Sequence, residues 1–103
     1  MDSDAQLLSL AIEIAREAGE LARTRREAGV AIAATKSGLA DIVTEADREV
    51  EQLIRARIAE ARPDDGFCGE ESAATEGSSG LTWVVDPIDG TVNYAYGIPA
   101  YAV

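Results

Sequence analysis

The segment from Trp83 to Tyr94 carries two aspartates, Asp86 and Asp89, followed at once by Gly90 and Thr91. The apolar, β-branched residues before them are typical of a strand, so Asp86 is predicted to lie at the end of a rigid element. Because the chain turns there, both carboxylates can converge on one point, and Gly90 lets the backbone approach a ligand. Thr91 adds a hydroxyl group. Oxygen ligands of this kind favour magnesium, manganese or calcium.

The residues alone leave one alternative for this segment open and exclude another. An acidic turn with an Asx hydrogen bond at Asp89, and no bound ion, explains the same residues. A calcium loop of the EF-hand kind does not, because Pro87 and Ile88 stand where a ligand is needed. Gly97 also stands where a glutamate should close such a loop.

Charge is distributed unevenly along the chain. The 103 residues include 19 Asp and Glu against 9 Lys and Arg, for a formal net charge of -10, and no Lys or Arg follows Arg62. Apolar residues lie close to Glu70, Asp86 and Asp89 in the sequence, and bound cations are the natural partners of these three carboxylates. The other acidic side chains of this part are predicted to be solvated loop charges or to pair with arginines of the preceding part of the chain: Asp64, Asp65 and Glu76.

Length and composition limit the class of protein. The chain is long enough for one domain, and its 47% apolar content is ample for a core. No apolar run approaches the roughly 20 residues of a membrane span, so we expect a cytoplasmic protein with no membrane partner. Strong acidity argues against a nucleic-acid partner. The single cysteine, Cys68, is predicted to be a small buried residue. Histidine is absent, which leaves acid–base work to carboxylates, hydroxyl groups or water activated by a metal.

The elements that must position these groups can be read from the apolar spacing. Ser3 or Asp4 is predicted to cap a first helix that stops at Gly29, followed by a short strand over Val30–Ala34. One face of that helix is apolar at three- and four-residue spacing: Leu7, Ala11, Ile14, Ala18 and Leu21.

A second helix is predicted to begin at a capping box formed by Thr44 and Asp47. Its inward positions are Val50, Leu53, Ile54 and Ile58. After a turn at Pro63–Gly66 and a Ser-, Ala- and Gly-rich loop, the apolar run Leu81–Val85 is predicted to be a buried strand.

The last residues, Ile98–Val103, read as the beginning of another strand with no turn or cap after it. We therefore expect the chain to be the N-terminal part of a longer protein, which we call the parent protein. A strand cut at that point leaves an edge unpaired and an apolar face uncovered.

Four short motifs occur in order along the chain. They are Lys36, Asp41–Asp47 (DIVTEAD), Gly69–Ser72 (GEES) and Asp86–Asn93 (DPIDGTVN). In this order and spacing the chain resembles the inositol monophosphatase family, nearly from end to end, and in its tail it is most similar to bacterial members. The resemblance implies an α/β fold, a layered sandwich in which pairs of helices alternate with sheets. Residues 1–103 would form a single partial domain, incomplete at the C-terminus, and the parent protein would be a homodimer.

The resemblance also implies a metal site. Glu70 and Asp86, with the carbonyl group of Ile88, would hold one Mg²⁺, and Asp86 and Asp89 would hold a second. A further aspartate of this site belongs to the part of the family that lies beyond Val103.

The catalytic roles implied by the resemblance fall on three residues. Glu70 and Thr91 would orient and activate a water molecule, and Asp47 would accept a hydrogen bond from Thr91. Asp89, Gly90 and Thr91 would bind the substrate phosphate, which suits the backbone N–H groups at the start of a helix. Helix capping alone also explains Asp47, and a solvated loop charge also explains Lys36.

The function implied is the Mg²⁺-dependent hydrolysis of inositol monophosphate to inositol and phosphate by metal-activated water. The parent protein would be a phosphoric monoester hydrolase whose partner is a small phosphorylated polyol, and residues 1–103 alone are expected to be inactive. Two alternatives remain. One is a phosphatase of the same superfamily that acts on fructose bisphosphate, histidinol phosphate or a phosphonucleotide, and the other is a non-catalytic truncated half-domain.

Overall fold

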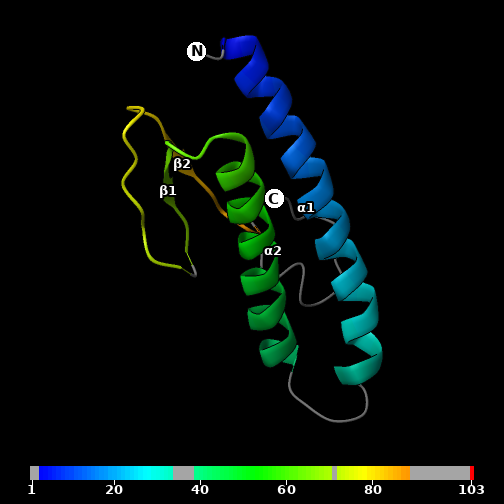
Figure 1. Ribbon diagram of the computed structural model, residues 1–103. Helices are drawn as coiled ribbons and strands as arrows, with labels where there is room; N and C mark the ends of the chain where they lie inside the picture. The colour runs from blue at the N-terminus through cyan, green and yellow to red at the C-terminus, as the bar shows by residue number, and fades with distance from the viewer. Residues whose placement is uncertain (1–2, 34–38, 71, 89–102) are drawn as a thin grey trace.

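The computed structural model describes residues 3–33, 39–70, 72–88 and 103. In this part of the chain the elements follow in the order α1 (Asp4–Ala33), α2 (Leu39–Ala61), β1 (Gly66–Cys68) and β2 (Thr82–Val84). The two helices lie side by side, and the two strands lie beside α2 (Figure 1). A helix pair next to the opening strands of a sheet is the arrangement expected from the sequence.

Helix α1 begins as predicted but ends later. Ser3 Oγ accepts a hydrogen bond from the backbone N–H of Gln6 at 3.2 Å, and Gln6 Oε1 accepts one from the backbone N–H of Ser3 at 2.7 Å. This reciprocal pair is a capping box. The stop predicted at Gly29 is wrong, and so is the strand predicted over Val30–Ala34, because the helix continues to Ala33. Alanine favours helix most strongly, and one interior glycine costs only about 1 kcal/mol.

Helix α2 begins before the predicted cap. It starts at Leu39, so Thr44 and Asp47 lie inside the helix and do not form its N-terminal capping box. The inward face was predicted correctly, since Val50, Ile54 and Ile58 are buried and Leu53 packs against the core. The apolar period of this helix therefore identifies its buried face, whereas the cap-like pair gave the wrong starting point.

The core lies where α1, α2 and the strands meet. Alanines at 0% exposure on α1, Ala18 and Ala22, allow the two helices to approach closely. Trp83 and Val85 pack against this core from the strand side. The buried apolar residues of the described chain are Ile14, Ala18, Ala22, Ala46, Val50, Ile54, Ile58, Phe67 and Ile88.

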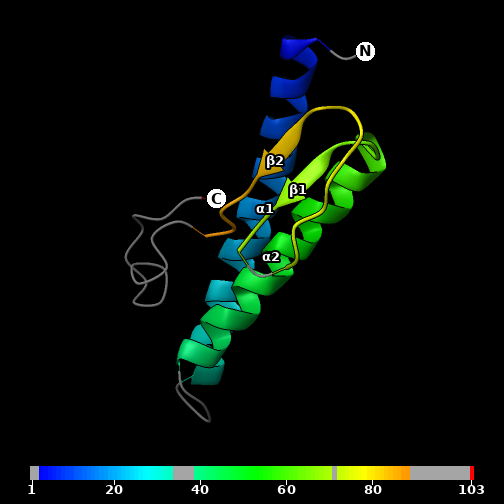
Figure 2. The ribbon, with the colours of Figure 1, turned by 90° about the vertical axis from the view of Figure 1, so that its left-hand side faces the viewer.

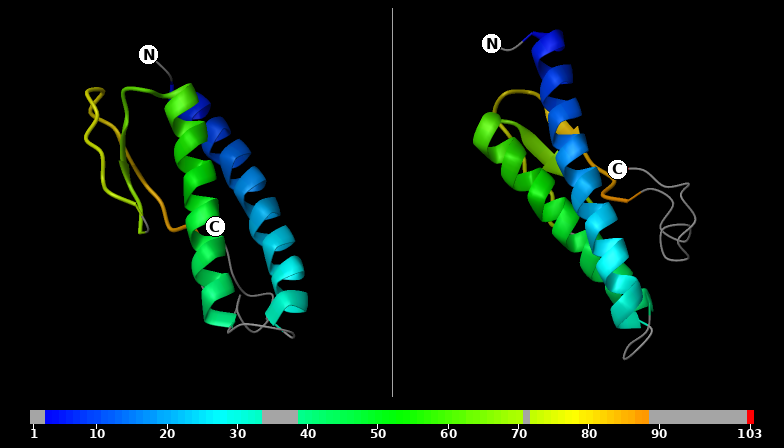
Figure 3. Two further views of the ribbon diagram at one scale, coloured as in Figure 1. Left: turned by 60° about the horizontal axis from the view of Figure 1, so that its bottom comes forward. Right: turned by 90° about the vertical axis from the view of Figure 1, so that its right-hand side faces the viewer.

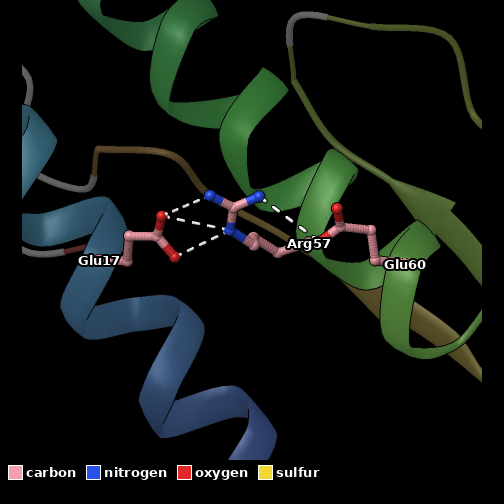
Figure 4. Close-up of polar contacts among 3 residues, drawn as sticks. All are labelled: Glu17, Arg57 and Glu60. Carbon is pink, nitrogen blue, oxygen red and sulfur yellow. Dashed lines mark hydrogen bonds and ion pairs between the residues drawn. The ribbon is translucent and has the colours of Figure 1, made fainter.

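Ion pairs on the surface join the two helices. Arg57 of α2 reaches Glu17 of α1, with Nη2 donating to Oε1 at 2.8 Å and Nε donating to Oε2 at 3.0 Å, and it also contacts Glu60 (Figure 4). The hydrogen bond from Arg57 lowers the pKa of Glu17 below its ordinary value. A second pair joins Arg25 Nε and Glu49 Oε2 at 2.5 Å. Exposed pairs of this kind add little stability, but they favour one register of the helix pair. The helices stay adjacent in the further views of Figure 3.

The two strands are parallel and lie side by side (Figure 2). Gly66 pairs with Thr82, Phe67 with Trp83 and Cys68 with Val84. On its other edge Phe67 exchanges two backbone hydrogen bonds with Thr75, each 2.8 Å long. Thus β1 lies between β2 and a short bridge from the connecting loop.

Strand β2 is less buried than its composition predicts. Val84 is 82% exposed and Thr82 is also exposed, whereas Trp83 is half-buried against the core. Only one face of β2 is covered by the described residues. Cys68, at the end of β1, is exposed as well, so the prediction of a small buried cysteine is wrong.

Asp65 pairs with an arginine, which is one of the two environments predicted for it. It is 8% exposed, and its carboxylate accepts hydrogen bonds from Arg62, Ser79 and Trp83. The hydrogen bonds from Arg62 are the main reason that the pKa of Asp65 falls from 3.8 to about 2. The carboxylate is therefore a structural anchor for the turn after α2, not a solvated loop charge. Neither described helix is apolar enough over sufficient length to span a membrane.

Candidate metal centre

Glu70 and Asp86 occupy equivalent positions after two paired parallel strands. Cys68 and Val84 are partners in the register, and each acidic residue lies two residues beyond its own partner. The pairing continues past the strand ends, because the N–H of Val85 donates to the carbonyl group of Cys68 at 2.9 Å. Parallel strands bring their carboxyl ends to one edge of the sheet, which is where ligands bind in open α/β sheets. The fold therefore brings two carboxylates to one edge from positions 16 apart in sequence.

Both carboxylates at this edge are open to solvent, since Glu70 and Asp86 are exposed. The chain has no Lys or Arg after Arg62, so basic side chains near this edge must come from the part of the chain up to Arg62. Arg55 of α2 is the one that reaches the β1–β2 loop, but its guanidinium group is held by Ser72, Ala73 and Thr75 within the described chain. Two accessible carboxylates at one edge suit a hard divalent cation.

The residues after Asp86 are anchored in the core. Pro87 and Ile88 are fully buried, and Ile88 is 1% exposed. An apolar anchor directly after the strand fixes the direction in which the chain leaves the sheet. The carbonyl group of Ile88 was predicted as a metal ligand, and the burial of its side chain holds that backbone in place. Asp89, Gly90 and Thr91 were also predicted for the site, and all three lie outside the described residues, as does Lys36.

Asp47 lies inside α2 and is 8% exposed. Because the helix begins at Leu39, Asp47 is beyond the first turn, where an N-terminal cap would act. Helix capping, the alternative explanation for this aspartate, is therefore ruled out. A buried carboxylate in mid-helix carries a desolvation cost that capping does not offset, and the catalytic role that the resemblance implies for Asp47 stays a prediction.

Glu51 is a residue of this region that sequence reasoning missed. It lies one helical turn after Asp47, is 2% exposed, and accepts a hydrogen bond from the backbone N–H of Glu70 at 2.6 Å. The sequence does contain a signal for it. Charged residues recur every four positions at 47, 51 and 55, directly beside the apolar row at 46, 50, 54 and 58. Such a charged row borders the buried face of the helix and so meets the strands.

The donor set fits an oxygen-binding cation, although the described residues do not complete a site. Within residues 3–33, 39–70, 72–88 and 103, no three Asp, Glu, Cys or His side chains gather closely enough to hold an ion. Glu70 and Asp86 supply carboxylate oxygens, and Mg²⁺ takes only one or two carboxylates in many sites. The third carboxylate predicted for this edge, Asp89, follows directly after the buried Ile88.

The chain matches the model of the inositol monophosphatase family over residues 3–103. Among curated proteins, the inositol-1-monophosphatase SuhB of Mycobacterium tuberculosis is 42% identical over 113 residues, which cover 96% of this chain and 39% of the relative. Inositol monophosphatase 1 of Sus scrofa is 40% identical, over 95% of this chain and 36% of the relative. The chain thus spans well under half the length of these relatives.

Solved structures give the same result for the fold. The structure of Mycobacterium tuberculosis SuhB matches this chain with a TM-score of 0.76 at 42% sequence identity, and the match covers 98% of this chain and 34% of the SuhB chain. The structure of the extragenic suppressor protein suhB of Bartonella henselae matches with a TM-score of 0.75 at 30% sequence identity, and the match covers 92% of this chain and 35% of the suhB chain. The layered α/β fold expected from the sequence is confirmed by these matches.

Proposed function

Because this chain belongs to the inositol monophosphatase family, we propose that the parent protein is a metal-dependent phosphoric monoester hydrolase that acts on inositol monophosphate. One observation carries the proposal most directly. Glu70 and Asp86 lie at matching positions beyond the ends of β1 and β2, so both carboxylates belong to one edge of the sheet.

The residues of this chain divide the work as follows. Glu70, Asp86 and the carbonyl group of Ile88 bind a divalent cation, Mg²⁺ by preference, and Asp86 with Asp89 binds a second. When bound, such a cation supplies Lewis-acid polarisation of the phosphate ester and makes water more acidic. The anchored Ile88 fixes the backbone at this edge, so that the ligands are held before the substrate arrives.

The remaining roles concern the attacking water and the phosphate group. Glu70 and Thr91 orient the water, and Asp47 accepts the hydrogen bond of the Thr91 hydroxyl group, which aims the threonine oxygen at the water. The burial of Asp47 supports this role, because a carboxylate that faces a dry environment forms strong hydrogen bonds to hydroxyl donors. The backbone at Asp89, Gly90 and Thr91 receives the phosphate oxygens.

A substrate panel tests the proposal. The full-length parent protein is assayed for phosphate release from inositol monophosphate, fructose bisphosphate, histidinol phosphate and a phosphonucleotide, with Mg²⁺ and again with excess chelator. We expect inositol monophosphate to be hydrolysed fastest and release to stop with chelator. Release that persists with chelator would contradict the metal-dependent mechanism, and a clear preference for another ester would correct the substrate. No release from any of the esters would favour a non-catalytic protein.

The family resemblance further leads us to propose a cytoplasmic homodimer.

A further inference from the structure

Glu51 reaches from α2 to the loop that carries Glu70. Its Oε1 accepts the backbone N–H of Glu70 at 2.6 Å, and its Oε2 accepts the hydroxyl group of Ser72 at 2.6 Å. Both carboxylate oxygens therefore bind the short segment around Glu70, from positions 19 and 21 residues away in sequence. The side chain is 2% exposed, so these hydrogen bonds form away from water.

The backbone at Gly69 closes directly over this carboxylate. A Cβ atom at Gly69 would overlap both oxygens and the carboxyl carbon of Glu51. The absence of a side chain at Gly69 is thus what allows the backbone N–H of Glu70 to approach the carboxylate within hydrogen-bonding distance. Gly69 and Glu51 are both needed for this hydrogen bond, because the glycine lets the backbone approach and the glutamate supplies the acceptor for the N–H of Glu70.

Arg55, one helical turn after Glu51, holds the same loop further along. Its Nη1 donates to Ser72 Oγ at 2.7 Å and to the carbonyl group of Ala73 at 2.8 Å, and its guanidinium group lies 4.7 Å from the centre of the Phe67 ring. Because Ser72 Oγ accepts from Arg55, its single proton is directed at Glu51. The loop is therefore fixed to α2 at two successive turns.

A carboxylate is a costly way to fill this position if packing were its only purpose. Burying an ionised group is unfavourable unless charge-assisted hydrogen bonds compensate, and a mutation that removes one partner leaves the other unsatisfied. The donors that compensate at Glu51 include the backbone N–H of Glu70 and the hydroxyl group of Ser72. One result of burying this carboxylate is therefore a fixed backbone at Glu70.

We propose that Glu51 is a positioning residue for the metal centre: its buried carboxylate fixes the backbone at Glu70 and so aims the Glu70 side chain at the cation. This inference rests on the proposed function, because it assigns Glu51 to the same site. Glu51 does not touch the cation or the substrate, and it acts through the loop alone. Partners that orient a metal ligand in this way commonly change metal affinity or activity by about 10–100-fold when they are altered.

The test compares Glu51→Asp with Glu51→Gln in the full-length parent protein. Glu51→Asp keeps the charge but withdraws the carboxylate from the loop by one methylene group. Glu51→Gln keeps the reach, so its amide oxygen still accepts from Glu70 and its NH₂ group can donate to Ser72. A positioning role predicts that Glu51→Asp lowers kcat and weakens Mn²⁺ binding about 10–100-fold, with KM little changed, whereas Glu51→Gln loses less than about tenfold. A role based on charge predicts the reverse order and would overturn the proposal.

Three control variants make the outcome decisive. Glu60→Asp shortens an exposed glutamate of the same helix and should leave both measurements unchanged. Glu70→Gln separates the metal assignment of Glu70 from the positioning role of Glu51. If Glu70→Gln binds Mn²⁺ as tightly as the unmodified protein, the metal assignment fails. If Glu70→Gln binds Mn²⁺ more weakly but Glu51→Asp binds it as tightly as the unmodified protein, the positioning role fails. Should Glu51→Asp not fold, Ser72→Ala removes one exposed partner of the carboxylate. We expect it to lower kcat about two- to tenfold, with the protein still folded at the assay temperature, and an unchanged kcat would overturn the proposal.

Discussion

The indole Nε1 of Trp83 donates a hydrogen bond to Asp65 Oδ2 at 2.9 Å, which ties β2 to the turn that follows α2. The same carboxylate accepts from Arg62 at 2.7 and 3.0 Å and from Ser79 at 2.5 Å. One buried carboxylate thus joins the end of α2, the β1–β2 loop and β2. These are the elements that deliver Glu70 and Asp86 to their common edge.

Replacing Asp65 by Asn should destabilise the parent protein by on the order of 2–3 kcal/mol, because an amide cannot accept all of these hydrogen bonds and leaves Arg62 without its counter-charge. Urea denaturation would measure the change in the free energy of unfolding. The matched control is Asp64→Asn, since the neighbouring Asp64 is exposed. Equal stability of the two variants would show that the buried carboxylate is not an anchor.

Stability should also depend on pH through Asp65. Its pKa in the folded protein is about 2, below the ordinary 3.8. A depressed pKa means that the stabilisation is fully present above pH 3.8 and is lost as the pH falls from there toward 2. Unfolding free energies of the unmodified protein and of Asp65→Asn should therefore converge in that window. A difference that stays constant down to pH 2 would contradict the assignment.

Replacing each of two glycines by alanine should change the free energy of unfolding in opposite directions. A Cβ at Gly77 would overlap the carbonyl oxygen of Asp64 and the backbone nitrogen of Gly66, whereas at Gly19 it would meet nothing within 4 Å. We expect Gly77→Ala to cost about 1–3 kcal/mol and Gly19→Ala, in mid-helix, to add up to about 1 kcal/mol. Denaturant midpoints measure both. A neutral Gly77→Ala would mean that the loop does not pack on the turn after α2.

Asp47 is predicted to act on turnover more than on binding. Asp47→Asn removes the negative charge that we propose as the acceptor for the hydroxyl group of Thr91, so we expect kcat to fall about a hundredfold or more with KM changed far less. Steady-state kinetics on inositol monophosphate would give both parameters, with Asp64→Asn as the control at an exposed site. A change confined to KM would argue for substrate binding in place of water activation.

Periodicity in the sequence predicted the buried face of α2, and the apolar, β-branched run predicted where β2 lies, although β2 is less buried than that run indicates. The row of Val50, Ile54 and Ile58 identified the inner face of α2, and the run before Asp86 identified β2. Element ends were predicted less well. Gly29 does not stop α1, because the helix-favouring alanines around it outweigh a single glycine. Thr44 does not start α2, because the helix already begins at Leu39.

The candidate site was predictable only in part. Glu70 and Asp86 were found because motifs and strand ends mark them, and their shared edge follows from the parallel pairing. An arginine partner was one of the alternatives predicted for Asp65. The burial of Asp65 and the whole environment of Glu51 were not predicted, since they depend on donors distant in sequence, such as the indole of Trp83 or the backbone of Glu70. Composition predicts that a glutamate or aspartate is exposed, and only the fold shows which donors surround it.

A Mn²⁺ titration of the full-length parent protein tests the central claim most directly, with the electron paramagnetic resonance signal of free Mn²⁺ as the readout. The unmodified protein is compared with Glu70→Gln, Asp86→Asn and Glu76→Gln, the last at an exposed glutamate of the β1–β2 loop. If Glu70 and Asp86 hold the cation together, each of their variants should bind Mn²⁺ at least about tenfold more weakly, and Glu76→Gln should bind it like the unmodified protein. Equal binding by all four proteins would contradict the metal centre proposed at the edge of β1 and β2.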